Sequence, residues 1–183
     1  MKRILYIVLA LMLAFSCMGE DLSGISPESW VQPEVLCEDG LAIAEVIAGS
    51  SSVLISVEKG EDYYLWPEVS LYLHAFSELP ANYFTKNEAM DLGWDSRLGN
   101  LWVVAPGMVI GGDRFGNYER QLPTAKGRKY YECDADYEGG YRDGRRIVFS
   151  SDGLIYLTLD HYDTFILLYD GWYEDGASYV PAK

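Results

Sequence analysis

Residues 128–168 contain four runs rich in apolar and aromatic side chains, with three short turn signals between the first three runs. The turn signals are EGG (138–140), DG (143–144) and SDG (151–153). Asp-Gly between runs of this kind is the strongest short-range signal for a β-hairpin. The stretch therefore predicts an antiparallel meander, with strands expected at residues 129–135, 145–150, 153–158 and 164–168.

Alternation along these strands predicts which side chains share a face. Successive side chains of a strand point to opposite faces, so Cys133 and Glu132 are separated. If the apolar side chains face the core, Glu132 shares the other face with Arg146 of the next strand. Arg142 and His161 lie in turns that can reach that face. The pattern thus predicts a group of one carboxylate, two guanidinium groups and one imidazole.

Such a group contains what is needed to cleave RNA through its own 2′-hydroxyl. The reaction needs a base for that hydroxyl, an acid for the departing 5′-oxygen and fixed cations for the charge on the phosphate. Arginine suits the last task because its planar fork binds phosphate with two hydrogen bonds. From spacing alone, an ion-paired sheet surface with a histidine in a turn is the more common source of the pattern.

A longer series of motifs between residues 79 and 165 favours the catalytic group over the ion-paired surface. The motifs are LPANYFTKNEA (79–89), LGW (92–94), GNL (99–101), APG (105–107), IGGDRFGNYERQLP (110–123), YECD (131–134), YRDGRRI (141–147), SSD-LIY (150–156) and DHY-TF (160–165). In content and order they resemble the guanyl-preferring microbial ribonucleases of the barnase type, and the match needs no gap. So many motifs in one order are far more specific than any single short motif.

The resemblance implies an α+β fold in which N-terminal helices pack on a twisted antiparallel β-sheet. It also implies an endoribonuclease that cleaves single-stranded RNA after guanine, first to a 2′,3′-cyclic phosphate and then by hydrolysis. Glu132 matches the general base and His161 the general acid. Lys86, Arg142 and Arg146 match the side chains that hold and stabilise the phosphate.

The loop FGNYER at 115–120 matches the guanine-binding loop of the family. The residues expected to bind substrate are Phe115, Asn117, Tyr118 and Glu119, with Tyr162 beside the general acid. In the family the glutamate at the position of Glu119 accepts two hydrogen bonds from guanine, and adenine does not present that pair of donors. Asn117 suits the left-handed backbone of such a loop. Tyr118 departs from the arginine of barnase, which puts affinity in doubt but not the chemistry.

The expected partners follow from the same match. They are single-stranded RNA and an acidic protein inhibitor of the barstar type, with no DNA substrate and a monomeric enzyme. No cofactor is expected, and no metal, because side chains supply the cations and the sequence has no CxxC motif or Cys/His cluster. The alternative is a catalytically weak or inactive surface or secreted binding protein on the same fold, since fold alone does not confer function.

The N-terminus is typical of a secretory signal peptide over residues 1–16. Lys2 and Arg3 precede apolar residues 4–15, a run too short to span a bilayer. Either ordinary cleavage releases the protein, or Cys17 is lipidated and gives the only attachment to a membrane. The sequence leaves these two routes open, and both place the protein outside the cytoplasm.

Charge divides the remaining chain into an acidic extension at 17–57, a ribonuclease-like domain at 58–168 and an acidic, aromatic tail at 169–183. The whole chain carries a net charge of −14. Nucleic-acid binders are usually basic, so this acidity argues against an RNA substrate and predicts slow encounter with RNA at low salt. Residues 18–40 are predicted to be a linker or loose arm. The acidic residues 17–65 as a whole are either a solvated spacer or a weak competitor for the RNA-binding cations.

Several local features remain to be placed. Residues 41–57 contain two apolar runs that form either a hairpin or a helix and a strand. Cys37 and Cys133 are either a disulfide or two thiols. Residues 66–77 have the apolar stripe of a helix, and His74 falls between stripe positions, which predicts a solvated surface histidine. We expect a helix that is capped by Thr85 and Glu88 and ends at Gly93, and a short helix that begins at Asn100. We also expect a strand at residues 108–115 that two glycines interrupt.

Overall fold

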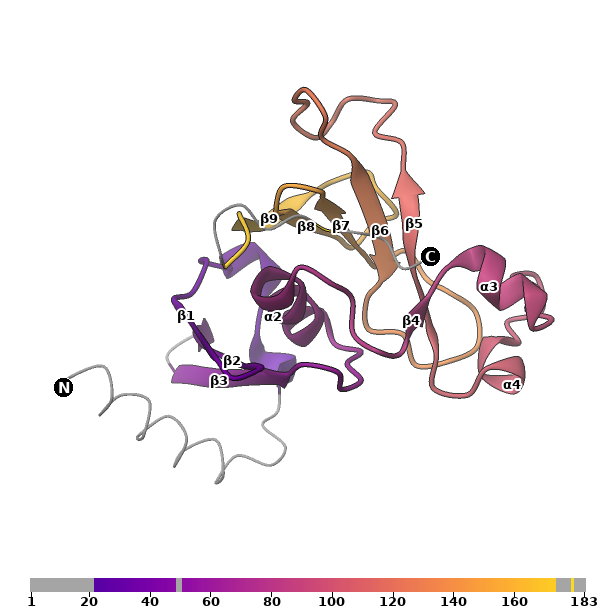
Figure 1. Cartoon of the computed structure of the whole chain (residues 1–183), viewed down its shortest axis with the longest axis horizontal. Coiled ribbons are helices and arrows are strands. Elements are labelled where there is room, and N and C mark those ends of the chain that lie inside the picture. The colour runs from indigo at the N-terminus through magenta and orange to yellow at the C-terminus, as the bar shows by residue number, and fades with distance from the viewer. Residues whose placement is uncertain (1–21, 49–50, 174–178, 180–183) are drawn as a thin grey trace.

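The computed structural model describes residues 22–48, 51–173 and 179 (Figure 1). The predicted signal peptide, Cys17 and most of the tail beyond residue 173 lie outside the described residues. Two short 3-10 turns, Leu22–Gly24 and Pro27–Ser29, precede strands β1 (Val35–Glu38), β2 (Leu41–Ala48) and β3 (Ser51–Glu58). The middle of the chain contains α2 (Trp66–Phe76), β4 (Tyr83–Phe84), α3 (Lys86–Asp91) and α4 (Leu101–Val104). The remaining strands are β5 (Val109–Phe115), β6 (Tyr130–Asp134), β7 (Arg146–Ser150), β8 (Leu154–Thr158) and β9 (Ile166–Asp170).

The strands form two sheets, and the α+β class expected from the sequence is confirmed. The larger sheet has the order β4-β5-β6-β7-β8-β9 and is antiparallel except for the pair β4 and β5. The predicted meander is therefore correct to within one residue at the bounds of its first three strands, and the last strand is shifted to Ile166–Asp170 from the predicted residues 164–168. The shift arises because Thr164 belongs to the preceding turn, where its backbone N–H and hydroxyl both donate to Asp160.

The register of the larger sheet separates its side chains as alternation predicts. Cys133 pairs with Ile147 across β6 and β7, and both side chains lie in the main apolar core. Glu132 pairs with Val148, which belongs to a separate cluster on the other face. At Gly111 of β5 the packing is so close that a Cβ would lie 2.6 Å from the side chain of Cys133. This glycine lets β5 run close to β6 at the bulge between residues 111 and 113.

Helix α2 lies between the larger sheet and a second sheet of order β1-β2-β3. Figure 1 shows this helix above the small sheet and beside the strands of the large one. Pro67 occupies the first turn, where its missing N–H does no harm, and Ser77 ends the helix in the left-handed conformation. Because apolar layers cover both sides, nearly the whole helix is buried rather than one stripe.

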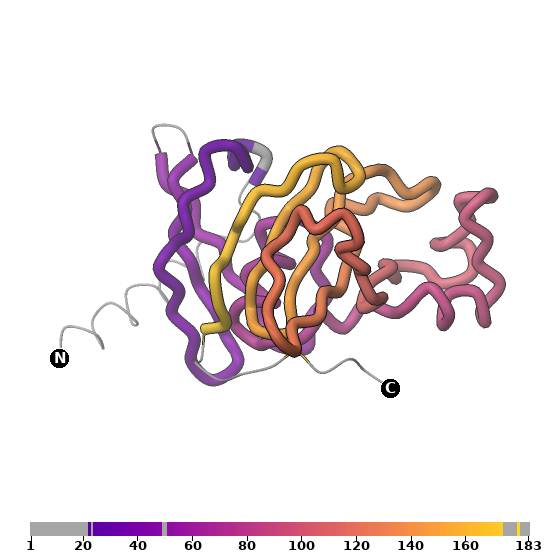
Figure 2. Tube along the Cα trace, turned by 90° about the horizontal axis from the view of Figure 1, so that it is seen from above, coloured from indigo at the N-terminus to yellow at the C-terminus, as the bar shows by residue number. Residues whose placement is uncertain are grey.

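The prediction of a loose arm at residues 18–40 is wrong for the residues described. Trp30 packs edge-on against Trp66 at 5.0 Å between ring centroids, and its indole N–H donates to the carbonyl of Leu168 at 2.9 Å. The backbone N–H of Asp170 donates to the side chain of Gln32 at 3.2 Å. Figure 2 shows this indigo segment alongside the yellow β9. Residues 41–57 form the hairpin of β2 and β3, which was one of the two alternatives.

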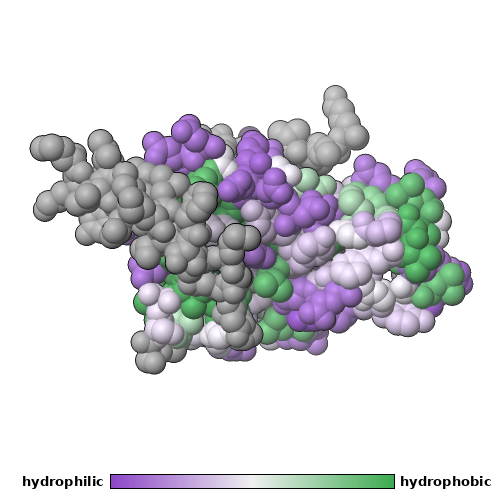
Figure 3. Space-filling view, turned by 90° about the horizontal axis from the view of Figure 1, so that it is seen from below, coloured by the Kyte–Doolittle hydropathy of each residue, from purple (hydrophilic) through white to green (hydrophobic). Residues whose placement is uncertain are grey.

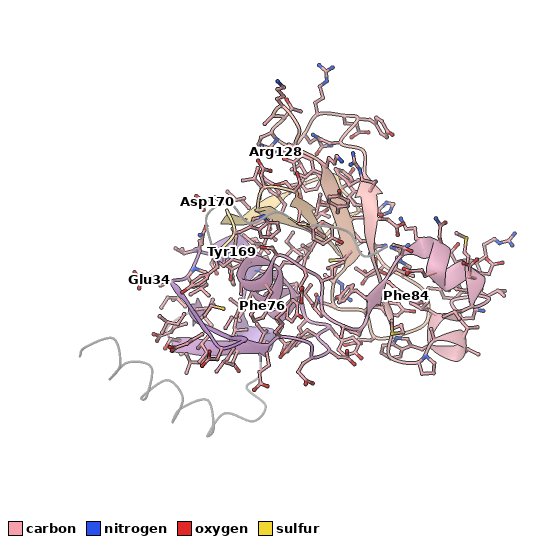
Figure 4. All side chains as sticks on the ribbon, viewed as in Figure 1. Glu34, Phe76, Phe84, Arg128, Tyr169 and Asp170 are labelled. Carbon is pink, nitrogen blue, oxygen red and sulfur yellow. The ribbon has the colours of Figure 1, made fainter. Side chains whose placement is uncertain are left out.

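His74 is also placed differently from its prediction as a solvated surface residue. It is 7% exposed, and its ring stacks on Tyr169 with 4.3 Å between ring centroids. Its Nδ1 lies 2.7 Å from the carbonyl oxygen of Gly171. Figure 4 shows Tyr169 of β9 close to α2, which is why this side of the helix is covered. Burial lowers the pKa of His74, so its ring is held in the neutral form.

Two further findings concern cysteine and the surface. Cys133 is a buried thiol rather than half of a disulfide, as in the second of the two alternatives.

Apolar side chains gather at the end of the molecule formed by α3 and α4, which is green in Figure 3. The large exposed ones are Met90, Leu92, Leu98 and Val103. Among the described residues, no helix has the length and apolar character needed to cross a membrane.

Candidate active site

Glu132 lies on β6, on the face of the large sheet that is turned away from α2. It is 7% exposed, and both carboxylate oxygens are engaged. Lys86 Nζ lies 2.5 Å from Oε1, and the hydroxyl of Tyr162 donates to Oε2 at 2.6 Å. Burial acts to raise the pKa of Glu132, but the bonds from Lys86 and Tyr162 outweigh it and leave the pKa below its usual value. The carboxylate is therefore ionised and able to accept a proton.

Lys86 reaches Glu132 from the first turn of α3. The capping box predicted from the sequence is present, with Thr85 accepting from the N–H of Glu88 and Glu88 accepting from the N–H of Thr85. The backbone N–H of Lys86 donates to Asp113 of β5 at 2.9 Å. The start of the helix is thus fixed to the sheet, and the lysine is directed across β5 to β6.

Arg142 and Arg146 meet at Asp134, which is 1% exposed on β6. Arg142 donates to both carboxylate oxygens of Asp134 at 2.6 Å. Arg146 Nε lies 2.9 Å from the same carboxylate, and its Nη1 donates to the carbonyl of Arg145. Arg146 is 3% exposed, whereas Arg142 is partly exposed and lies 5.8 Å from the ring of Trp94. Asp134 therefore holds two guanidinium groups beside Glu132, with Arg142 nearer the surface.

His161 and Tyr162 occupy a turn between β8 and β9 with left-handed backbone, at φ of 58° and 77°. Such a conformation is uncommon for these residues and needs support from its surroundings. Thr158 accepts from the N–H of Tyr162 at 2.9 Å, and the N–H of His161 donates to the carbonyl of Gly144 at 3.1 Å. These bonds hold the exposed imidazole beside the Tyr162 ring, at 4.7 Å between centroids.

A second carboxylate stabilises the same turn from within. Asp160 accepts from the hydroxyl of Thr158 at 2.9 Å and from the hydroxyl of Thr164 at 2.6 Å. Hydrogen bonds lower the pKa of Asp160 to about 2, and the one from the Thr164 side chain contributes most. The turn that presents His161 is therefore held by a carboxylate that stays charged at ordinary pH.

The loop at 115–122 lies next to this group. Phe115 of β5 packs against Tyr162 with 5.2 Å between ring centroids. Asn117 has the left-handed backbone that the sequence predicted, with φ of 44°, and its amide group exchanges two hydrogen bonds with the backbone of Leu122. Tyr118 is 95% exposed, and the exposed Glu119 accepts from Gln121 at 2.9 Å.

The fold thus brings every predicted site residue to one face of the sheet or to a loop beside it. Direct contacts join Glu132, Lys86 and Tyr162, and Phe115 and His161 contact Tyr162. Arg142 and Arg146 form a neighbouring group through Asp134. Tyr118 and Glu119 project from the adjacent loop into solvent.

Three carboxylates that arrange the site have no role in the prediction from sequence: Asp113, Asp134 and Asp160. Each acts through a partner, since Asp113 fixes the start of α3, Asp134 holds the arginines and Asp160 supports the turn of His161. A usable signal existed for Asp134, because it shares a strand face with Glu132 and lies opposite Arg146.

Comparison with known proteins places the chain in a family. A family model described as ribonuclease matches residues 68–169, which is more than half of the chain. The chain belongs to this ribonuclease family. A ribonuclease of Heyndrickxia coagulans is 53% identical over 97 residues, which make up 53% of this chain and 89% of that protein. Ribonucleases of Bacillus intermedius and Bacillus pumilus are 53% identical over 97 residues, and the match covers 60% of each.

The region of this ribonuclease that matches the family model contains every candidate site residue, from Lys86 to Tyr162. It leaves out β1, β2 and β3. Within the described part of the chain, no group of three or more His, Cys, Asp or Glu side chains is arranged to hold a metal ion. The arrangement offers instead a charged carboxylate, an exposed imidazole and fixed cations.

Proposed function

We propose that this ribonuclease is an extracytoplasmic endoribonuclease that cleaves single-stranded RNA after guanine. The observation that carries the proposal is the state of Glu132. It is a nearly buried carboxylate with a lowered pKa, held between Lys86 and Tyr162 on the same face as an exposed histidine. Family membership and the names of the relatives support RNA as the substrate.

The first step is transfer of the phosphate within the RNA strand. Glu132 takes the proton of the 2′-hydroxyl, whose oxygen attacks the adjacent phosphorus. The bond from phosphorus to the 5′-oxygen of the next nucleotide breaks, and His161 donates a proton to that oxygen. The products are a strand ending in a 2′,3′-cyclic phosphate and a strand with a free 5′-hydroxyl.

The second step opens the cyclic phosphate with water, and the two residues exchange roles. His161 accepts a proton from the water, and Glu132 returns a proton to the 2′-oxygen as its bond to phosphorus breaks. In both steps negative charge gathers on the phosphate oxygens. In this scheme Lys86 and Arg142 bind those oxygens, and the buried Arg146, which shares Asp134 with Arg142, adds positive charge to the site.

Tyr162 has a positioning role in this scheme. Burial, followed by the hydrogen bond to Glu132 and the charge of that carboxylate, raises the pKa of Tyr162 well above the usual value for tyrosine. Its hydroxyl therefore stays protonated and donates to Glu132. This bond directs the second carboxylate oxygen, and the tyrosine ring supports both His161 and Phe115.

Guanine preference rests on the loop at 115–122. Glu119 is an exposed carboxylate on a loop whose shape is fixed by Asn117. It can accept hydrogen bonds from the ring N–H and the amino group of guanine, a pair of donors that adenine lacks. Phe115 and the exposed Tyr118 provide aromatic surface at this loop.

The direct test uses the purified protein and dinucleotides that differ only in the first base. We expect fastest cleavage of the guanine dinucleotide, with the cyclic phosphate accumulating before the 3′-phosphate. The matching deoxydinucleotide should be inert because it lacks the attacking 2′-hydroxyl. Equal cleavage after all four bases would remove the guanine assignment, and cleavage of DNA would remove the mechanism. Secretion is tested separately, by finding whether the protein outside the cytoplasm begins after residue 16.

A further inference from the structure

Tyr179 lies beyond the region that matches the family model, which ends at residue 169. It is nevertheless a core residue, since it is 7% exposed and belongs to the main apolar cluster. The centroid of its ring lies 4.7 Å from that of Tyr131 and 4.8 Å from that of Phe149. Burial raises the pKa of Tyr179, so its hydroxyl stays neutral. A residue outside the matched region therefore contributes to the core face of the large sheet.

The hydroxyl of Tyr179 lies against the bulge of β5. Gly112 has a left-handed backbone with φ of 90°, and a Cβ there would lie 3.4 Å from the hydroxyl oxygen of Tyr179. The same Cβ would lie 3.7 Å from the side chain of Leu79 and 3.8 Å from that of Thr85. The glycine is thus enclosed by three side chains, and Tyr179 fills the space on the core side of the bulge.

The bulge connects this contact to the candidate active site. Asp113 follows Gly112 and accepts a hydrogen bond from the backbone N–H of Lys86 at 2.9 Å. Thr85, which caps α3, lies next to the same glycine. Figure 1 shows α3 beginning beside β4 and β5. A shift of the bulge would therefore move both the cap and the carboxylate that fix the start of α3, and with them the lysine that bonds to Glu132.

Tyr179 also lies behind the strand that carries the proposed base. Tyr131 precedes Glu132 on β6, so their side chains point to opposite faces. The Tyr131 ring contacts Tyr179 and lies 5.4 Å from the guanidinium group of Arg114. Asp113 pairs with Glu132 across β5 and β6. The ring of Tyr179 thus supports the two strands from the core side at the level where they carry these carboxylates.

We propose that Tyr179 is a positioning residue for the reaction, which holds the bulge of β5 so that Lys86 meets Glu132. This inference rests on the proposed function and adds to it a residue from outside the region matched by the family model. A packed interior closes around a lost side chain, so removal of the ring lets the bulge relax toward the core. Lys86 then moves away from Glu132, and the carboxylate loses part of the bonding that lowers its pKa.

Tyr179→Ala in the full chain tests this through the pH dependence of kcat/KM on a guanine dinucleotide. The acid limb of a bell-shaped profile reports the base, and the alkaline limb reports the acid. We expect the acid limb to move up by roughly one pH unit, because a carboxylate that loses a cationic partner is more easily protonated. The other groups that lower the pKa of Glu132 are Tyr162 and Arg142, which come from other segments and stay in place. The maximum of kcat/KM should fall by roughly tenfold, since Lys86 is displaced from the phosphate.

Two control variants separate positioning from general stabilisation. Leu71→Ala removes a fully buried side chain of α2 from the same apolar core, away from the bulge. It should lower stability and leave both limbs of the pH profile unchanged. Tyr179→Phe retains the ring and should restore the wild-type profile. If Tyr179→Ala does not fold, Tyr179→Leu is measured in its place, because leucine keeps apolar volume but not the reach of the ring.

The titration of Glu132 separates this inference from the proposed chemistry, since it needs no RNA. NMR of the Glu132 carboxyl carbon should show a higher pKa in Tyr179→Ala than in the wild type or Tyr179→Phe. A raised pKa in a protein that cleaves no RNA would count against the proposed function and support the positioning role. An unchanged Glu132 pKa in the folded variant would overturn the inference, however much stability is lost. A shift of the same size in Leu71→Ala would also overturn it, because any loss of core packing would then suffice.

Discussion

The two faces of the large sheet use the same strands for opposite purposes. On the face toward α2, Cys133 and Phe149 are buried in an apolar core. On the other face, Glu132 and Asp134 are almost as deeply buried, at 7% and 1% exposure, but they carry charge. The difference lies in the partners rather than in exposure. An apolar side chain needs only close packing, whereas a buried carboxylate needs cations and hydrogen-bond donors to offset its lost hydration.

The two histidines repeat this contrast. His74 is stacked in the core on the α2 side, and burial lowers its pKa. His161 is exposed in a left-handed turn on the site side. The first contributes packing inside the protein, and the second is accessible to a bound molecule. We therefore expect a variant on the Glu132 face to alter activity with little effect on stability. A variant on the face toward α2 should lower stability with little effect on activity.

The largest expected effect is on the site face. Glu132→Gln keeps the shape of the side chain but removes the proposed base, so we expect activity on RNA to fall by roughly 100- to 10,000-fold. His161→Ala should lose activity to a similar extent, since the leaving oxygen then has no acid. Circular dichroism and thermal unfolding should remain close to those of the wild type. Glu138→Gln, a change at an exposed carboxylate in a turn, serves as the control. Near-normal activity of either site variant would remove that residue from the mechanism.

The next effect is on the core face. Phe149 is fully buried and packs against Tyr131 and Tyr179, so Phe149→Ala should lower the free energy of unfolding by about 3–5 kcal/mol. Chemical denaturation measures this loss. Activity per folded molecule at low temperature should change little, and Leu167→Ala, at an exposed position of β9, should change stability by less than about 0.5 kcal/mol. A large drop in kcat without a loss of stability would show that the two faces are not separable.

Specificity should respond more moderately. Glu119→Ala removes the proposed acceptor for guanine, and hydrogen bonds to a charged group are worth about 1.5–3 kcal/mol, or roughly 10- to 100-fold. We expect that loss in the preference for guanine over adenine dinucleotides, with an unchanged pH profile. Gln121→Ala removes only a donor to Glu119 and should have a smaller effect. Retention of the guanine preference in the Glu119 variant would contradict the assignment.

The smallest effect should come from His74. Its pKa is lowered by burial in the folded state, so the unfolded chain binds more protons below the ordinary histidine pKa of about 6.5. Stability from this residue is complete above that pH and decreases as the pH falls toward the lowered pKa. The difference in unfolding free energy between wild type and His74→Phe should therefore change across this range. The prediction is contradicted if the difference in unfolding free energy between the two proteins stays constant between about pH 5 and 7.

Prediction from sequence succeeded where local physical rules decide the structure. The Asp-Gly turns placed the meander, the alternation of side chains put Glu132 and Cys133 on opposite faces, and Thr85 with Glu88 formed the predicted capping box. It failed for His74 and for the acidic extension. Both failures have one cause, which is contact between segments far apart in the chain. The second sheet covers α2. Trp30 packs on Trp66 and donates a hydrogen bond to β9.

The acidic extension illustrates what a charge count cannot decide. The described residues 22–48 and 51–58 pack on the α2 side, away from the face that carries Glu132. This position does not fit an arm lying across the site cations, nor a free solvated spacer. Acidic residues of the strands can face water while the alternate apolar side chains enter the core.

The sequence by itself determined the strands of the meander, their turns, the chemical types of the site residues and the family resemblance. These follow from backbone preferences and side-chain alternation, which act over a few residues. Only the tertiary structure decided that Asp134 holds both arginines and that His74 is buried. Ion pairing and burial depend on which distant segments meet, so the charge available to a substrate is settled only when the chain is folded.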